Sequence, residues 1–532
     1  MVSNTAEAVN LDDMPYAFGA GYSQEKGCLP GTRESLIRDI CDILNNPIED
    51  APRVCLLTGA AGSGKSTVAH SIAGLYDGQM RLGSSYFFNL SDVMRRDPRN
   101  FFSTIARDLS DHDPQFRSAL WEVVQFNRAV RTSTSPLEQV ERLIIEPSNH
   151  LHSVGPLVIV VDALDESGDL FGRRRFLPLF SAQITQDKLP ANLRFFITAR
   201  PESDVLAAFP PGPQIVRKNL DVIPVSIVNE DIGKLIDHSL SQYSELESYW
   251  PHREWCQLLI LHSRCLFLWA SVACEFISGG LDVRERLETL LRVDGTASTL
   301  DSMYESILGQ LLPSPNSVHQ FQNVMAIVLL LKEPLPLASL SALFGRVLDV
   351  RSILKPMGSL LVGVTDEKTP IRPLHPSFSD FLKDRSSTFH IDILPRHSLT
   401  VGRALLACMQ EMLKFNICDL RDARVLNTAI PNLPSRVNKA IPPHVAYSCQ
   451  YWMDHMQDAD CSAELLDEVT SFFKDTFPFW LEAISLLSLS SPVCYILASL
   501  QTCTILKEWA KVGLTMVMNA ECGMLNIKLL GP

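Results

Sequence analysis

At 532 residues the chain is long enough to bury several hydrophobic cores, and its length favours three or four domains. The composition, 46% apolar and 20% charged, is that of a folded globular protein and excludes disorder on a large scale. The formal net charge of −13, without a long run of Lys or Arg, argues against nucleic-acid binding, which needs a basic face.

The cellular setting is indicated by cysteines and by the lack of targeting segments. The 13 cysteines show no CxxC pair and no zinc-ligand spacing, so we expect reduced thiols and a cytoplasmic location. The first 25 residues contain no Lys, Arg or apolar block, so no signal peptide is expected. The uncharged stretch 483–506 is long enough to span a bilayer, but Pro492 and its polar residues favour a buried helical hairpin. We therefore expect no membrane partner.

The first 230 residues alternate between strand and helix patterns. Residues 1–26 are expected to be irregular, and Thr32 is the expected N-cap of a helix whose apolar residues share one face over 36–44. Short apolar runs predict strands at 54–58, 85–88, 157–161 and 193–198, and helical patterns lie at 68–75, 101–109 and 116–126. Such alternation predicts an α/β domain built on a parallel sheet flanked by helices.

The remainder of the chain has a helical character. Apolar helical stretches are expected at 258–277, 303–312 and 324–331. Within 334–382 we expect short helices and a hairpin strand at 359–364, which together suit a small helical domain with a β-wing. Everything beyond residue 395 again indicates helix, and no repeat with a period of 20–50 residues is present.

One motif carries clear chemistry. The GxxxxGK[ST] pattern of a phosphate-binding P-loop is matched in full by Gly59, Ala60, Ala61, Gly62, Ser63, Gly64, Lys65 and Ser66. Glycines let successive backbone N–H groups turn toward phosphates, and the following helix adds its positive N-terminus. Lys65 is suited to reach the β- and γ-phosphates, and the Ser66 hydroxyl is suited to bind Mg²⁺. A buried strand before the motif and a helix after it supply the context that it requires.

Acidic residues follow the strongest predicted strand. Asp162 ends the run 157–161, and a carboxylate in this position of a P-loop domain holds Mg²⁺, so Ser66 and Asp162 are the expected metal ligands. Asp165 and Glu166 follow, and one of them is suited to orient or deprotonate the attacking water. The alternative for this pair is a charge pair at a helix N-terminus, where acids are favoured in any case.

Arg200 follows the run 193–198 in the segment TARPE. In that position its charge faces the γ-phosphate and is suited to sense or stabilise it. A surface salt bridge is the competing interpretation. With Asp165 and Glu166, Arg200 completes the expected catalytic set.

The segments CLLTGAAGSGKST, LVIVVDALDES and LRFFITARPES resemble the NACHT family of STAND-type signalling P-loop NTPases. More narrowly, GCLPGTRESLI, YFFNLSD, LFLWASVACEFI, LHPSFSDFL and YSCQYWMDHM resemble NACHT proteins of mushroom-forming fungi that carry a nephrocystin-3-like N-terminal domain, a group tied to fungal innate immunity. The resemblance covers residues 14–480. It implies a P-loop core followed by a helical domain, a winged-helix domain and C-terminal helices.

The resemblance adds nucleotide contacts beyond the P-loop. It implies that Thr67 completes the loop, that Arg33 contacts the base or ribose, and that His375 touches the β-phosphate of bound ADP. A structural histidine is the alternative for His375, and Pro376 stands where many relatives carry aspartate. A second departure lies at residues 265–268, where plant and apoptotic relatives have a glycine and a proline that packs on adenine. Phe267 either offers an apolar surface in its place or the contact is missing.

The family mechanism implied is a switch: ADP holds the winged helix closed, and exchange for ATP opens the protein and permits self-association. The expected ligands are ATP or ADP with Mg²⁺, and the motifs do not distinguish ATP from GTP. Slow hydrolysis is expected, and the alternative is a pseudo-switch or scaffold fragment without turnover. A DNA-binding winged helix is disfavoured by the acidic composition, which favours an intramolecular lid.

The expected division is an irregular segment 1–26, a NACHT core 27–215, a helical domain 216–312, a winged-helix-like domain 313–390 and a helical region 391–532. Relatives usually carry an effector domain before the NTPase and a repeat sensor after it, and neither pattern is recognisable here. Residues 503–532 fall outside the resemblance, which we interpret as truncation or an altered gene model. The signal and the effector are unknown from the sequence.

Overall fold

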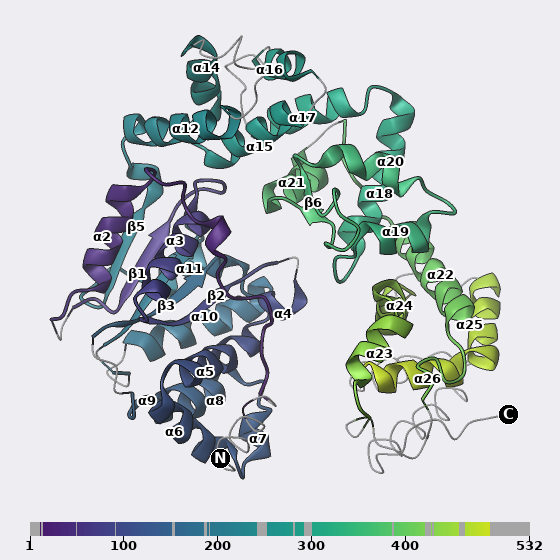
Figure 1. Cartoon of the computed structure of the whole chain (residues 1–532), viewed down its shortest axis with the longest axis horizontal. Coiled ribbons are helices and arrows are strands. Elements are labelled where there is room, and N and C mark those ends of the chain that lie inside the picture. The colour runs from purple at the N-terminus through teal and green to yellow at the C-terminus, as the bar shows by residue number, and fades with distance from the viewer. Residues whose placement is uncertain are drawn as a thin grey trace. The chain divides into compact units, whose positions relative to one another are not determined.

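A computed structural model of the chain divides into two compact units, Met1–Met303 and Tyr304–Pro532. Figure 1 shows the order of the helices and strands along the chain. The structure describes residues 11–489 with gaps at 12–13, 49–50, 91, 152–154, 186–188, 191, 242–252, 280–281, 292–299, 386–387, 421–426, 428–429 and 457–462.

A five-stranded parallel sheet forms the centre of the first unit. In the spatial order β2-β3-β4-β1-β5, its strands are Leu82–Phe87, Leu157–Asp162, Leu193–Ala199, Val54–Thr58 and Ile215–Asn219. The four predicted strands are confirmed as β1 to β4. The edge strand β5 was not predicted, because its sequence IVRKN is mostly polar and only its first residue is buried. The sheet therefore continues beyond residue 215, where the P-loop core was expected to end.

The alternation of side chains along the strands builds two hydrophobic cores. Cys55, Leu57, Val158 and Val160 face α2 (Glu34–Leu44) and α3 (Lys65–Gly78) on one side of the sheet (Figure 1). Residues of the opposite parity, such as Leu56 and Ile159, face the other core. That core contains residues of α5 (Phe101–His112), α6 (Pro114–Val124), α10 (Leu170–Thr185) and α11 (Ser203–Ala208). Because strands buried on both faces read as continuous apolar runs, the sequence revealed them readily.

The described part of the N-terminal segment is largely irregular, with one short helix at Gln24–Lys26, and it is packed into this unit. Residues 1–10, also expected to be irregular, lie outside the described residues. Leu11, Met14, Ala17 and Ala20 are buried in the second core. The carbonyl of Ala20 accepts a hydrogen bond of 2.8 Å from the backbone N–H of Phe87, at the end of the edge strand β2. Edge strands are commonly covered in this way, so the segment from residue 11 onward belongs to the α/β unit.

A partly buried carboxylate anchors that segment. Asp108 on α5 accepts hydrogen bonds from the Tyr16 hydroxyl at 3.0 Å and from the Ser84 hydroxyl at 2.6 Å. Burial raises the pKa of Asp108 to about 6, although both hydrogen bonds oppose the shift. An aspartate in an unfolded chain has a pKa of about 3.9. The folded state therefore gains stability from Asp108 at low pH and loses that gain as the pH rises through about 6.

Replacing Asp108 with asparagine is expected to raise the melting temperature at pH 8 by several degrees and to change it little at pH 4. Asparagine stays neutral, and the two hydroxyls are able to donate to it or accept from it, so the ionisation penalty of about 3 kcal/mol disappears. Thermal unfolding followed by circular dichroism at both pH values checks this. An equal shift at both pH values would show that ionisation is not the cause.

The first unit continues into helices after the sheet. They are α12 (Val225–Leu240), α14 (Arg253–Ser263), α15 (Phe267–Ser278) and α16 (Val283–Leu291). The apolar stretch expected at 258–277 is thus two helices, α14 and α15, rather than one. The break lies at Arg264 and Cys265, which both adopt left-handed backbone conformations, with φ of 45° and 65°. A right-handed helix cannot pass through two such residues.

The second unit holds the elements expected for a small helical domain with a hairpin. Helix α17 (Leu300–Leu311) leads into α18 (Pro315–Leu330), α19 (Leu337–Phe344) and α20 (Val350–Leu354). An antiparallel hairpin of β6 (Leu361–Val362) and β7 (Arg372–Pro373) follows, then α21 (Pro376–Asp380). The chain continues through α22 (Pro395–Met412), α23 (Leu433–Ala440), α24 (Pro443–Met456), α25 (Ala463–Asp475) and α26 (Phe477–Leu486).

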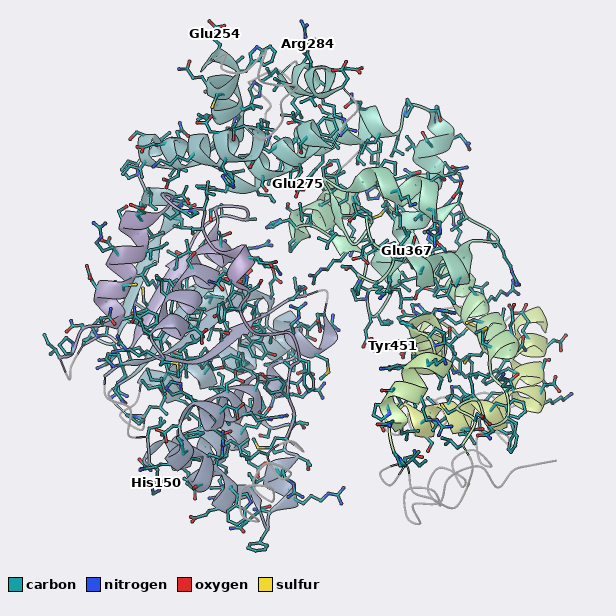
Figure 2. All side chains as sticks on the ribbon, viewed as in Figure 1. His150, Glu254, Glu275, Arg284, Glu367 and Tyr451 are labelled. Carbon is teal, nitrogen blue, oxygen red and sulfur yellow. The ribbon has the colours of Figure 1, made fainter. Side chains whose placement is uncertain are left out.

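Two polar contacts tie distant parts of this unit together, and both involve residues labelled in Figure 2. Glu367, in the segment between the hairpin strands, pairs with the guanidinium of Arg351 on α20. Tyr451 on α24 donates a hydrogen bond to the carboxylate of Glu333, which precedes α19. The C-terminal helices are therefore joined to the hairpin-bearing part by a specific hydrogen bond.

The described residues contain no helix that combines the length and the apolar character needed to cross a membrane. The uncharged stretch 483–506 includes the end of α26, and its part beyond residue 489 lies outside the described residues. The cysteines within the described ranges form no disulfide with one another.

Candidate functional site

The P-loop connects β1 to α3 at the carboxyl edge of the sheet. Gly62 and Gly64 have φ of 78° and 94°, a left-handed region that glycine adopts without strain. Gly64 is the N-cap residue of α3, and Lys65 and Ser66 form its first turn. The sequence prediction of strand, glycine loop and helix is therefore confirmed, and backbone N–H groups at the start of α3 are free to face an anion.

The Lys65 side chain lies along the P-loop. Its Nζ atom donates hydrogen bonds to the backbone carbonyls of Gly59 and Ala60, each at 2.8 Å. Burial lowers the pKa of the Lys65 ammonium, while the charges of Asp165 and Asp162 oppose that shift. The ammonium is thus held at the loop between carbonyl dipoles and two carboxylates, in a site suited to a phosphate chain.

Ser66 and Asp162 lie together at the end of β3. The Asp162 carboxylate accepts a hydrogen bond from the Thr198 hydroxyl, and the Ser66 hydroxyl lies close enough to favour its charged form. Burial raises the pKa of Asp162, and these two hydroxyls and the Lys65 charge oppose the shift. Mg²⁺ prefers hard oxygen ligands and usually takes one or two from protein, with phosphates and waters as the rest. The donor set of one hydroxyl and one carboxylate fits that ion.

The two acids beyond Asp162 have different surroundings. Asp165 is buried, and its Oδ1 accepts the backbone N–H of Arg200 at 2.9 Å. Its Oδ2 lies 3.4 Å from Arg200 Nε, so the carboxylate holds both the main chain and the side chain of Arg200. The arginine that follows β4 is therefore paired inside the site, and the side chain of Arg200 is 27% exposed.

Glu166 remains closer to solvent and is held less firmly. Its Oε2 accepts one hydrogen bond, 3.0 Å long, from the backbone N–H of Leu90 after β2. Burial raises the pKa of Glu166 to about 7, with the charge of Asp165 adding to the shift and the Leu90 hydrogen bond opposing it. A carboxylate with a pKa near the working pH is well suited to general-base chemistry.

Arg33 reaches the P-loop from the opposite side. It is the N-cap of α2, with φ of 57°, so the expected N-cap at Thr32 was wrong. Its Nη2 atom donates to the Ser63 carbonyl at 3.1 Å, and its backbone N–H donates to Asp231 on α12 at 3.1 Å. The side chain is buried, yet its Nε and Nη1 atoms have no hydrogen-bond partner among the residues that the structure describes. Two unsatisfied donors beside a phosphate-binding loop mark a place where a polar ligand would be stabilised.

The first turn of α15 lies directly on the P-loop. The backbone N–H of Leu268 donates to the Gly62 carbonyl at 3.1 Å, and a Cβ atom on Gly62 would lie 2.7 Å from the Cβ of Leu268. The Arg33 guanidinium stands over the Phe267 ring at 4.7 Å. The arginine thus covers one face of the Phe267 ring, and a contact of Phe267 with adenine stays a prediction.

Some residues of the site carried no signal in the sequence. Asp221 accepts a hydrogen bond from the backbone N–H of Ala60 at 3.2 Å and contributes to the electrostatic environment of Lys65. Asp231 and Leu90 act on Arg33 and Glu166 as described above. Each is separated from its partner by more than 70 residues along the chain, and single aspartates on helices or turns are too common to single out.

His375 lies in the second unit, at the start of α21. Its Nδ1 atom accepts a hydrogen bond from the backbone N–H of Ser377 at 3.1 Å and lies 2.8 Å from the Ser377 hydroxyl. The histidine is thus the N-cap of this short helix, and Pro376 takes the first helical position, where a missing N–H costs nothing. Its predicted contact with the β-phosphate of ADP stays a prediction.

The structure brings together, within the first unit, the sequence-predicted residues Arg33, the P-loop with Thr67, Asp162, Asp165, Glu166 and Arg200. The described residues include no cluster of three or more His, Cys, Asp or Glu side chains able to hold a metal ion. A Mg²⁺ ion at Ser66 and Asp162 would accordingly depend on the nucleotide phosphates for further ligands.

The chain is similar to several known proteins. Residues 31–200 match the family model described as nephrocystin 3, N-terminal. The chain is 24% identical over 370 residues to the vegetative incompatibility protein HET-E-1 of Podospora anserina; the match covers 62% of this chain and 25% of the relative. The chain thus spans about a quarter of the length of that curated relative.

Two solved structures from archaea show weaker likeness. A STAND protein with a tetratricopeptide repeat sensor from Pyrococcus horikoshii aligns with a TM-score of 0.42 and 13% identity, over 92% of this chain and 56% of that one. A Walker-type ATPase of Pyrococcus abyssi aligns with a TM-score of 0.32 and 15% identity, over 66% of this chain and 95% of that one.

Proposed function

We propose that this chain, whose residues 31–200 match the family model described as nephrocystin 3, N-terminal, is a NACHT-type protein that binds ATP with Mg²⁺ and acts as a nucleotide-controlled signalling switch. The observation that carries the proposal is the joint placement of Lys65, Ser66 and Asp162. The ammonium donates hydrogen bonds to the P-loop carbonyls, and the serine hydroxyl lies beside the carboxylate at the end of β3. These are the groups that cradle phosphates and hold the bound metal in P-loop NTPases. When bound, Mg²⁺ supplies charge neutralisation for the phosphate oxygens.

Slow hydrolysis follows from the unequal roles of the two acids. Glu166 is the general base, because its carboxylate is partly exposed and its pKa of about 7 lets it accept a proton near neutral pH. Asp165 holds Arg200 in place instead of contacting the water. Arg200 then senses the γ-phosphate, whose negative charge competes with Asp165 for the guanidinium.

The nucleotide state sets the conformation through the parts that follow the P-loop core. Since β5 ends the sheet at Asn219, we assign the helices that follow it, up to residue 312, as the helical domain. We assign 313–390 as the winged-helix-like lid and 391–532 as the C-terminal region, with His375 as the contact that favours ADP. A ligand shifts such an equilibrium only through its different affinity for the two conformations. ATP favours the open form, which self-associates in the cytoplasm, and nucleic acid and membrane take no part. The nucleotide-release assay below distinguishes bound ATP from bound GTP.

A nucleotide-release assay tests the binding proposal. The protein purified without added nucleotide is denatured by heat, and the supernatant is analysed by ion-exchange chromatography for ADP, ATP, GDP and GTP. We expect an adenine nucleotide at close to one per chain, or, where the site is empty, Mg²⁺-dependent binding of added ATP by calorimetry. Absence of both results contradicts the proposal.

Self-association is the prediction that separates a switch from a scaffold. Sedimentation velocity is expected to show a larger species with a non-hydrolysable ATP analogue and Mg²⁺ than with ADP. Nucleotide binding without phosphate release would identify the pseudo-switch, whereas self-association that ignores the nucleotide would identify the scaffold fragment.

A further inference from the structure

Thr198 is a polar residue in a strand whose other residues, apart from Arg194, are apolar. It lies near the end of β4, Leu193–Ala199, where every residue is buried, and its own exposure is 0%. A hydroxyl buried this completely must find hydrogen-bond partners, because an unsatisfied one would destabilise the fold. The partners of its hydrogen bonds therefore show which groups Thr198 positions.

Both hydrogen bonds of this hydroxyl go to the end of the neighbouring strand. Thr198 Oγ1 donates to Asp162 Oδ1 and accepts the backbone N–H of Ala163 at 3.1 Å. The parallel register pairs Ile197 with Val161, so Thr198 lies one step beyond, opposite the last residue of β3. A valine in the same place would fill the same volume and provide neither bond.

The backbone at Ala163 depends on this support. Its φ of 54° places it in the left-handed region, which costs a residue with a Cβ atom on the order of 1 kcal/mol or more. The turn through Ala163 leads at once into the short helix Leu164–Glu166, which carries both Asp165 and Glu166. One hydroxyl thus holds the aspartate at the strand end and the turn that places the acid pair.

We propose that Thr198 is a positioning residue for the Mg²⁺–nucleotide site: it orients the Asp162 carboxylate toward the metal position beside Ser66. The inference rests on the proposed function. By holding Oδ1, the threonine limits rotation of the carboxylate, so that its second oxygen is presented in a constant direction. Residues that support a metal ligand in this way typically change metal affinity or activity by about 10- to 100-fold when replaced.

The test is the Mg²⁺ dependence of ATP binding, measured by calorimetry in wild type, Thr198→Val and Thr198→Ser. Thr198→Val is expected to reduce the Mg²⁺-dependent gain in ATP affinity by about tenfold or more. Its affinity for ADP in EDTA is expected to stay within about twofold of wild type, since Lys65 and the P-loop amides still bind the phosphates. Thr198→Ser keeps the hydroxyl and is expected to restore most of the Mg²⁺ effect.

A second pair keeps the proposal testable where Thr198→Val does not fold. Thr198→Ala and Thr198→Ser both lack the γ-methyl group and differ only in the hydroxyl, so a difference between them in the Mg²⁺ effect reports the hydroxyl alone. The proposal is overturned if Val or Ala matches its hydroxyl-bearing partner in Mg²⁺ dependence. If wild type itself binds no nucleotide, the proposed function fails; if wild type binds Mg²⁺–ATP and the variants behave alike, only the role of Thr198 fails.

Discussion

Replacing Lys65 with alanine is expected to weaken ATP binding by on the order of 100-fold or more, which corresponds to about 3 kcal/mol. The ammonium is the principal positive charge on the P-loop, held there by the carbonyls of Gly59 and Ala60. Without it, the phosphates keep only backbone N–H groups, and the nearby carboxylates of Asp162 and Asp165 are no longer balanced. Equilibrium titration with a fluorescent ATP analogue in Mg²⁺ measures the loss.

The matched control is Lys439→Ala, which removes an exposed lysine from α23 in the second unit. This variant is expected to bind ATP as wild type does. Thermal unfolding of both variants without nucleotide shows whether the fold is retained. An Lys65→Ala protein that is folded and still binds ATP within a few-fold of wild type would contradict the assignment of the P-loop as the nucleotide site.

Replacing Glu166 with glutamine is expected to lower the rate of ATP hydrolysis by about 10²- to 10⁴-fold, the usual contribution of a general base. Glutamine retains an oxygen that is able to accept the Leu90 N–H, so the local backbone should be unchanged. ATP affinity is expected to stay within a few-fold of wild type, because Glu166 does not hold the phosphates. Single-turnover phosphate release measures hydrolysis, and calorimetry measures binding.

The pH profile gives an independent reading of the same residue. A base must be unprotonated to act, and the pKa of Glu166 is raised to about 7, so wild-type kcat/KM should rise with pH through about 7. The pH dependence of kcat/KM reports ionisations in the free protein, without bound nucleotide. In Glu166→Gln the rise near pH 7 should be absent. A profile that is the same in both proteins would assign the base to another group.

Asp165→Asn serves as the comparison for Glu166→Gln. The Asp165 carboxylate is paired with Arg200, so the substitution is expected to act through the arginine. It should change the preference of the protein for ATP over ADP. If Asp165→Asn instead removes the pH-dependent rise and Glu166→Gln leaves it unchanged, the two roles are reversed. The adjacent acids are thus distinguishable by measurement even though the sequence alone did not separate them.

Local chemistry made the P-loop and the central strands predictable. The sequence of residues 59–66 contains the glycines, the lysine and the serine whose properties are needed there, and the preceding strand is continuously apolar because both faces of the sheet are covered. The P-loop and the strands β1 to β3 lie within residues 31–200, which match the nephrocystin 3 N-terminal family model. The edge strand β5 was missed because one side of it has no neighbour, and its polar residues hide the pattern.

Contacts between segments that are distant in the chain could not be predicted from sequence patterns. Arg33 is held by Asp231 and stacks on Phe267, and the N-terminal segment covers the edge of β2. No local periodicity encodes these pairs, because each is made by the packing of elements far apart in the chain.

The sequence by itself determined that a phosphate-binding loop follows a buried strand, and that Asp162, Asp165, Glu166 and Arg200 lie at the same edge of the sheet. Only the tertiary structure decided what each of them holds. Asp165 is bound to Arg200, Glu166 keeps a single backbone hydrogen bond and a raised pKa, and Asp162 is held by Thr198 from the next strand. Identical carboxylates acquire different chemistry because burial and hydrogen-bond partners, which depend on the packing of strands and loops, set their charge and orientation.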